Sequence, residues 1–130
     1  MFQVAVEETF AAGHALRNYK GKCENVHGHN YKVRVVVVGD HLDAAGLLVD
    51  FVELRGRLAE VIRSLDHQFL NDLPPFTEIN PSAENIARYF YQELSRRLAA
   101  SSNGARLREV TVFESDTTSA TFSPETHPSA

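Results

Sequence analysis

With 130 residues, the chain has the length of one domain with one hydrophobic core. Apolar residues make up 43% of the sequence and charged residues 23%, which argues against a disordered or fibrous protein. The formal net charge of −4 excludes the strongly basic field that dominates non-specific nucleic-acid binding, so no nucleic-acid partner is expected.

The first residues do not resemble a secretory signal, because Met1–Phe10 contain Glu7 and Glu8 but no basic residue. The longest aliphatic run, Val35–Val38, is too short to cross a bilayer. Cys23 is the single cysteine, so no intrachain disulfide can form. We therefore expect a cytoplasmic protein without a membrane partner, in which the thiol of Cys23 is available for chemistry.

Two strands are predicted at the start of the chain. Phe2, Val4 and Val6 recur with period two, which predicts a strand from Phe2 to about Ala11. The β-branched segment further on predicts a second strand from about His27 to Gly39. A loop rich in Gly, Asn and Lys joins them, so the pair can form a long hairpin.

Two helices are predicted next. Asp50 is a suitable N-cap, with Glu53 as its capping-box partner, and an apolar face follows that predicts a helix from about Phe51 to Leu65. After a proline-rich segment, Ser82 caps a second amphipathic helix that should end at about Ala100.

Two more strands are predicted after the helices, from Leu107 to Glu114 and from Ser119 to Ser123. The order ββααββ predicts an α+β domain, in which an antiparallel sheet carries helices on one face. We assign this domain to residues 1–123 and interpret residues 124–130 as a flexible tail.

Three histidines predict a metal site. His27 and His29 are two residues apart at the start of a strand, so their side chains point to the same face. Hairpin pairing can bring His14 next to them. Three imidazole ligands leave one position of a tetrahedral zinc ion open, as in catalytic sites. An isolated His-x-His pair is usually a surface or hydrogen-bonded pair, but the nearby His14 and Cys23 favour a metal site here.

The thiol of Cys23 is the candidate reactive group beside this site. A thiol close to a divalent cation loses its proton readily, so Cys23 can act as a general base or nucleophile, or can itself bind the metal. The alternative is an inert, buried cysteine. Its charged neighbours Lys22 and Glu24 argue against burial.

Two acidic positions have both a structural and a functional interpretation. Asp66 and His67 place a carboxylate beside an imidazole, a pair that is usually structural and acquires a catalytic role only if Cys23 lies nearby. Glu114 ends an apolar strand, where it is either a surface charge or, if buried, an acceptor for two parallel N–H bonds from a flat, amidine-like ligand edge.

Together these motifs resemble the 6-pyruvoyltetrahydropterin synthase family, and within it the bacterial 6-carboxytetrahydropterin synthase branch. The resemblance covers nearly the whole chain and rests on Phe10–His14, Cys23–Tyr31, Val49–Phe51, Leu65–Asn71, Asn80–Asn85 and Phe113–Glu114. It implies a tunnelling fold, with a four-stranded antiparallel sheet and two helices on one side, that forms trimeric barrels and stacks as a homohexamer.

The resemblance also implies an activity. Family members act on 7,8-dihydroneopterin triphosphate, and in this branch the products are 6-carboxy-5,6,7,8-tetrahydropterin, acetaldehyde and triphosphate, on the route to queuosine. The implied roles are zinc (Zn2+) ligation by three histidines, proton transfer by Cys23 and by an Asp-His pair from a neighbouring subunit, and pterin binding by a glutamate. These residues are His14, His27, His29, Cys23, Asp66, His67 and Glu114.

Glu24 departs from the pattern of this branch. It creates the motif E-x-x-H-G-H, which resembles a variant branch that uses Glu in place of Cys and forms a 6-hydroxymethyl pterin for folate synthesis. With both Cys23 and Glu24 present, either reaction is open, as is a non-catalytic zinc- or pterin-binding module. Arg17, Lys20 and Lys22 are candidates for binding the triphosphate, or are ordinary solvated charges.

Overall fold

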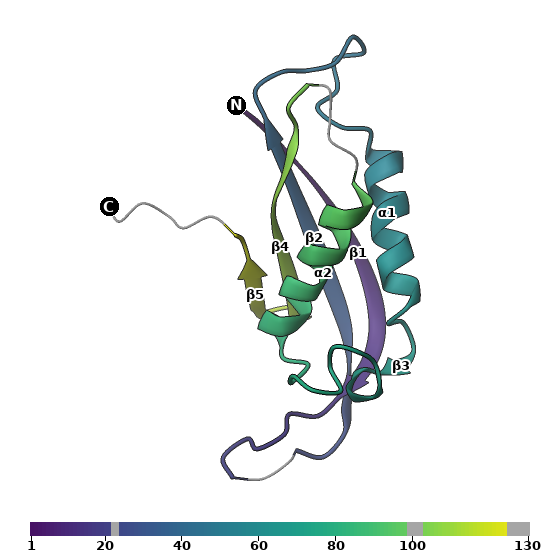
Figure 1. The fold of residues 1–130 in the computed structure, drawn as a ribbon, viewed down its shortest axis with the longest axis vertical. Coiled ribbons are helices and arrows are strands. Elements are labelled where there is room, and N and C mark those ends of the chain that lie inside the picture. Colours follow the sequence, from purple (N-terminus) through teal and green to yellow (C-terminus); the bar gives the residue numbers. More distant parts are fainter. Residues whose placement is uncertain (22–23, 99–102, 125–130) are drawn as a thin grey trace, which may run out of the picture.

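The computed structural model describes residues 1–21, 24–98 and 103–124. Five strands form one sheet in the order β3-β1-β2-β4-β5, and both helices lie on the same side of the long strands (Figure 1). In chain order the elements are β1 (Phe2–His14), β2 (His27–Gly39), α1 (Phe51–Arg63), β3 (Gln68–Phe69), the 3-10 helix η1 (Leu70–Asp72), α2 (Ala83–Arg97), β4 (Arg106–Ser115) and β5 (Thr118–Phe122).

The predicted α+β fold is confirmed, with one additional strand. The four predicted strands are antiparallel neighbours, whereas β3 pairs in parallel with Ala12 and Gly13 at the edge of β1. At two residues, β3 is too short to show a hydrophobic period, so the sequence pattern did not predict it.

β1 continues to His14, past its predicted end at Ala11. Alanine and glycine have low strand propensity, but pairing with a neighbouring strand outweighs this preference. The antiparallel register of β1 and β2 is unbroken, from Phe2 opposite Gly39 to His14 opposite His27. The hairpin therefore carries His14 and His27 to the same end of the sheet.

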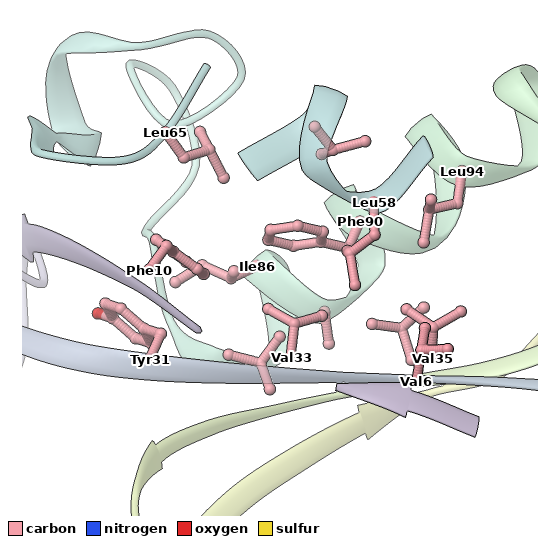
Figure 2. Close-up of a cluster of buried hydrophobic side chains, with 14 of the residues drawn as sticks. Val6, Phe10, Tyr31, Val33, Val35, Leu58, Leu65, Ile86, Phe90 and Leu94 are labelled. Carbon is pink, nitrogen blue, oxygen red and sulfur yellow. The ribbon is translucent and has the colours of Figure 1, made fainter. Parts of the chain in front are cut away.

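The hydrophobic core lies between the two helices and one face of the sheet (Figure 2). Alternate residues of each strand face the helices, as the period of a strand requires. Phe10 stacks on Tyr31 across the hairpin, with ring centroids 5.0 Å apart, and also contacts Phe90 of α2. The core therefore fixes the same alternation that orients the side chains at the end of the hairpin.

Both helices begin at the predicted caps. The carboxylate of Asp50 accepts the N–H of Val52 at 2.8 Å, and the hydroxyl of Ser82 accepts the N–H of Asn85 at 3.2 Å. α1 ends at Arg63 because the chain turns there, although Leu65 stays buried beyond its end.

The predicted end of α2 was too late, because the helix ends at Arg97 and Ala100 lies outside the described residues. Among the helices that the structure describes, none combines the length and apolar character needed to cross a lipid bilayer.

Candidate metal centre and active site

The three predicted histidines meet at the end of the β1–β2 hairpin. The centroid of the His14 ring lies 4.5 Å from that of His27 and 5.0 Å from that of His29, and the rings of His27 and His29 are 4.9 Å apart. The convergence follows from the register and the strand period, because His14 pairs with His27, and His29 shares its face. The structure brings the three predicted residues together, and their role as metal ligands stays a prediction.

Glu114 of β4 completes this cluster. One ligand atom from each of the three histidines and from Glu114 lies within 4.8 Å of the others. The pairing of β2 with β4 brings Glu114 there, since Lys32 stands opposite Phe113 in their register. The sequence predicted Glu114 as a pterin-binding residue and did not predict its contact with the histidines.

Backbone carbonyl groups orient two of the rings. Nδ1 of His14 lies 2.8 Å from the carbonyl oxygen of Pro81, and Nδ1 of His27 lies 3.0 Å from that of Asn25. A carbonyl oxygen can only accept a hydrogen bond, so Nδ1 of each ring carries the hydrogen. In the neutral ring, Nε2 then presents a lone pair, which is the form that binds a metal ion.

The Nε2 atoms of His14 and His29 face a carboxylate, which tests whether a cation fits. Oε1 of Glu114 lies 3.3 Å from Nε2 of His14 and 2.9 Å from Nε2 of His29. Both nitrogens are buried and lack a hydrogen-bond partner among the described residues. In His14, Nδ1 carries the hydrogen, so Nε2 and the Glu114 oxygen are two acceptors in contact, which is unfavourable unless a positive charge lies between them. Imidazole nitrogens and a carboxylate oxygen are suitable ligands for zinc.

Burial favours the metal-binding form of His29. It lowers the pKa of His29 below its ordinary value of 6.5, and the negative charge of Glu114 opposes this effect. A neutral imidazole is needed for ligation, because a protonated ring has no lone pair to donate.

Asp66 and His67 lie beside Ala11, at the edge of β1. Oδ1 of Asp66 accepts the N–H of Ala11 at 2.9 Å, and the N–H of His67 donates to the carbonyl of Ala11 at 2.6 Å. Oδ2 of Asp66 lies 3.1 Å from Nδ1 of His67. The hydrogen bond from Ala11, together with His67, lowers the pKa of Asp66 below 3.8. The pair is therefore held by the backbone of the strand that carries His14.

The side chain of His67 is 80% exposed and faces open space. A hollow of about 450 Å3 is lined by residues that include Gly13, Gly28, His29, His67 and Phe69. Within the described residues, no hydrogen bond, ion pair or ring contact joins Asp66 or His67 to the cluster of histidines and Glu114, although His67 and His29 line the same hollow. The structure thus groups the site residues into two parts, while Cys23 lies outside the described residues.

Arg17 has a structural role that the sequence did not predict. Its guanidinium group donates to the carbonyl oxygens of Asn71, Phe76 and Ile79, at 3.3, 2.7 and 3.3 Å. These bonds attach the segment after β1 to the proline-rich segment, so they do not support Arg17 as a triphosphate ligand. Lys20 is exposed, and Lys22 lies outside the described residues.

Residues of the proline-rich segment support the candidate metal centre without belonging to it. Pro81 supplies the carbonyl group that orients His14, and the side-chain amides of Asn71 and Asn80 bind the backbone of residues 15 and 17. The sequence signal was their place in the family motifs Leu65–Asn71 and Asn80–Asn85. Such backbone contacts have no spacing pattern that a sequence reveals.

The chain is similar to known pterin synthases over nearly its full length. The family model described as 6-pyruvoyl tetrahydropterin synthase matches residues 3–125. The chain is 34% identical to 6-carboxy-5,6,7,8-tetrahydropterin synthase of Synechocystis over 134 aligned residues, which cover 98% of each protein. It is 35% identical to human 6-pyruvoyl tetrahydrobiopterin synthase, covering 88% of this chain and 86% of the relative.

The fold is also shared with solved structures. The 6-pyruvoyl tetrahydropterin synthase of Caenorhabditis elegans superposes with a TM-score of 0.83 at 26% identity, covering 95% of this chain and 96% of that one. The family match spans β1 to β5 and includes every residue of the histidine and glutamate cluster. The chain therefore belongs to the 6-pyruvoyl tetrahydropterin synthase family.

Proposed function

We propose that the protein is a zinc-dependent lyase that converts 7,8-dihydroneopterin triphosphate and water to 6-carboxy-5,6,7,8-tetrahydropterin, acetaldehyde and triphosphate. The observation that carries this proposal is the convergence of His14, His27 and His29 beside Glu114. The similarity to the Synechocystis 6-carboxy-5,6,7,8-tetrahydropterin synthase supports this branch of the family.

In this proposal, Nε2 atoms of the histidines hold the metal ion. Zinc, when bound, supplies a Lewis acid next to the oxygen atoms of the substrate side chain. Glu114 anchors the pterin, because its carboxylate can accept the ring N–H and the amino group side by side. This places the reacting side chain within reach of the histidine cluster, since Glu114 itself lies there.

Protons are moved by the remaining site residues. Cys23 acts as the general base toward the side chain, and Asp66 and His67 exchange protons with the substrate from another direction. The exposed ring of His67 supports this role, because Asp66 is held by Ala11 and can in turn fix the orientation of the ring.

We further propose that the active site is completed between subunits of a homo-oligomer. Within one chain, no hydrogen bond or ion pair joins the Asp66–His67 pair to the histidine cluster, which supports this arrangement. Most of β1 also has an edge without a strand partner in the described residues, because β3 covers it only at Ala12 and Gly13. Such an edge is suited to pairing with a strand of another subunit.

The activity is tested by incubating purified protein with 7,8-dihydroneopterin triphosphate and identifying the pterin product by mass. We expect the 6-carboxy product, and we expect a Cys23→Ala variant to lose turnover while it retains the zinc content of the parent. A 6-hydroxymethyl product instead would favour the folate-directed alternative that the Glu24 motif suggests. Unchanged turnover in the Cys23→Ala variant would show that Cys23 is not the base.

The shared active site is tested by mixing two inactive variants. Cys23→Ala and His67→Ala subunits are dissociated, mixed and reassembled, with each variant alone as the control. If Cys23 and His67 of one site come from different subunits, mixed oligomers contain some intact sites and regain part of the parent activity. Absence of any recovery in verified mixed oligomers would place both residues of a site in one chain.

A further inference from the structure

The carboxylate of Glu24 is engaged by the backbone of the loop that joins β1 to β2. Oε1 of Glu24 accepts the N–H of Leu16 at 3.0 Å, and the backbone N–H of Glu24 donates to the carbonyl of Leu16 at 2.9 Å. The two hydrogen bonds form a clip that closes the loop, and the side chain of Glu24 is half-buried in it.

The clip is the middle member of three similar contacts. The side-chain amide of Asn71 binds both backbone groups of Ala15, with distances of 3.0 and 2.7 Å. The amide of Asn80 binds both backbone groups of Arg17 in the same way, at 2.8 and 3.0 Å. Residues 15 to 17 are therefore each held at their N–H and C=O groups, directly after the metal-binding His14.

Through these contacts, the backbone groups of the residues after β1 keep hydrogen-bond partners, as they would in a β-sheet. Each backbone group that would otherwise lose its partner at the strand end is satisfied by another part of the chain. Of the three residues, only Leu16 is held by a residue of the same loop, Glu24. The Glu24 clip therefore determines where the loop returns toward His27.

The chemistry that this clip requires differs from that of a base. An oxygen atom that accepts an amide N–H is sufficient for the clip, and a neutral carboxamide supplies such an oxygen as well as a carboxylate does. A general base instead needs a proton affinity matched to the reaction and must reach the proton that it removes. In the structure, Oε1 of Glu24 is directed at the backbone of Leu16.

We propose that Glu24 is a positioning residue, which closes the loop between β1 and β2 and does not exchange protons with the substrate. This inference rests on the proposed function, in which the base is Cys23, the residue that precedes Glu24 in the sequence. Glu24 then acts through the loop and through His14, and the motif E-x-x-H-G-H does not by itself direct this chain to the 6-hydroxymethyl product.

The test compares Glu24→Gln with Glu24→Ala. Glutamine retains the oxygen that accepts the N–H of Leu16 but cannot act as a base, so we expect its kcat/KM to stay within about twofold of the parent. Alanine removes the acceptor, and we expect about a tenfold loss of kcat/KM from misplacement of the loop. The pH profile and the pterin product of Glu24→Gln should match those of the parent.

A second measurement does not depend on activity. Zinc affinity, measured by competition with a chelator, should weaken in Glu24→Ala and stay unchanged in Glu24→Gln, because the clip lies two residues from His14. Glu78→Ala is the matched control, since Glu78 is exposed and its carboxylate has no partner among the described residues. Zinc affinity in this control should equal that of the parent.

The pattern of results decides the inference. Rescue by glutamine in both kcat/KM and zinc affinity supports the clip. A large activity loss in Glu24→Gln, or a changed pH profile, would identify Glu24 as a proton-transferring group and overturn the inference. Parent-like behaviour of Glu24→Ala would overturn it as well. Failure of the proposed function is recognised separately, because the parent itself would then form no pterin product while the zinc measurements still test the clip.

Discussion

Glu114 and His29 face each other from neighbouring parts of the sheet, with Oε1 of Glu114 2.9 Å from Nε2 of His29. The same oxygen lies 3.3 Å from Nε2 of His14. A carboxylate in this position can either ligate the metal ion or hold the pterin next to it. The two roles have different consequences for metal content and for substrate affinity, so one variant separates them.

We expect Glu114→Gln to retain zinc and to lose substrate affinity. Three histidines suffice to hold the ion, whereas the amide cannot accept two parallel N–H bonds. Loss of a charge-assisted contact should raise KM about tenfold to 100-fold. Metal analysis and steady-state kinetics check this, with Glu78→Gln as the control. A zinc content well below that of the parent would show instead that Glu114 is a metal ligand.

Tyr31→Phe should stabilise the protein. The hydroxyl of Tyr31 is buried without a hydrogen-bond partner among the described residues, and burial raises the pKa of this residue, so the hydroxyl stays protonated. Figure 2 shows the oxygen directed away from Val33. Removing an unpaired buried hydroxyl should add about 1 kcal/mol to the free energy of unfolding, which calorimetry can measure as a higher Tm.

Tyr91→Phe is the matched control for Tyr31→Phe. The hydroxyl of Tyr91 donates to the carbonyl of Leu107 at 3.2 Å, so its removal should lower the free energy of unfolding by about 1 kcal/mol. The two substitutions delete the same atom and should change Tm in opposite directions. A lower Tm for both would mean that the hydroxyl of Tyr31 has a stabilising partner.

Asp66 should stabilise the folded protein above its lowered pKa. The hydrogen bond from Ala11 and the neighbouring His67 favour the ionised carboxylate in the folded state. Because the folded pKa lies below the unfolded value, this stabilisation is complete above the unfolded pKa and is lost as the pH falls through the folded pKa. Asp66→Asn should therefore be less stable than the parent at pH 5, by a margin that narrows below about pH 4.

Urea unfolding of Asp66→Asn and the parent across this pH range measures the margin. Asp72→Asn provides the comparison, because Asp72 is exposed in η1 and its carboxylate has no hydrogen-bond or ion-pair partner in the part of the chain that the structure describes. The difference in the free energy of unfolding between Asp72→Asn and the parent should stay small at every pH. A margin for Asp66→Asn that does not change on acidification would contradict the stabilising role of the ionised form.

Arg17→Lys should affect stability more than substrate binding. A lysine ammonium cannot reproduce the planar set of donors with which Arg17 binds three carbonyl groups. We expect a loss of about 1–2 kcal/mol in the free energy of unfolding and less than about a threefold change in KM. Lys20→Ala is the comparison on the same loop. A KM increase of tenfold or more for Arg17→Lys would restore Arg17 as a triphosphate ligand.

Long elements with a clear period were predictable from the sequence. β2 has the predicted bounds, and α1 begins at the predicted Phe51, because alternation and capping residues are local signals. The end of β1 was not predictable from the sequence, because Ala12 and Gly13 belong to a strand only through their pairing with β2 and β3. Strand pairing is a tertiary property that these small residues do not encode locally.

The candidate site was predictable to the extent that it depends on spacing. The His27-Gly28-His29 spacing and a hairpin were enough to bring three imidazole rings together. The contact of Glu114 with the histidines depends on the register between β2 and β4, and the hydrogen bond from Ala11 to Asp66 joins segments far apart in the chain. The pairing register of two strands that lie far apart in the chain cannot be predicted from local patterns in a single sequence.

The unbroken pairing of β1 and β2 makes chain length, as well as residue identity, a condition for the convergence of the three histidines. Deleting one residue between Phe10 and His14 would turn the His14 ring to the opposite face of the sheet, while Phe10 kept its place in the core. Deleting two would restore the orientation but withdraw the ring by about 6.8 Å. An insertion or deletion of one or two residues in this part of the hairpin should therefore separate the candidate metal ligands, even though it removes none of them.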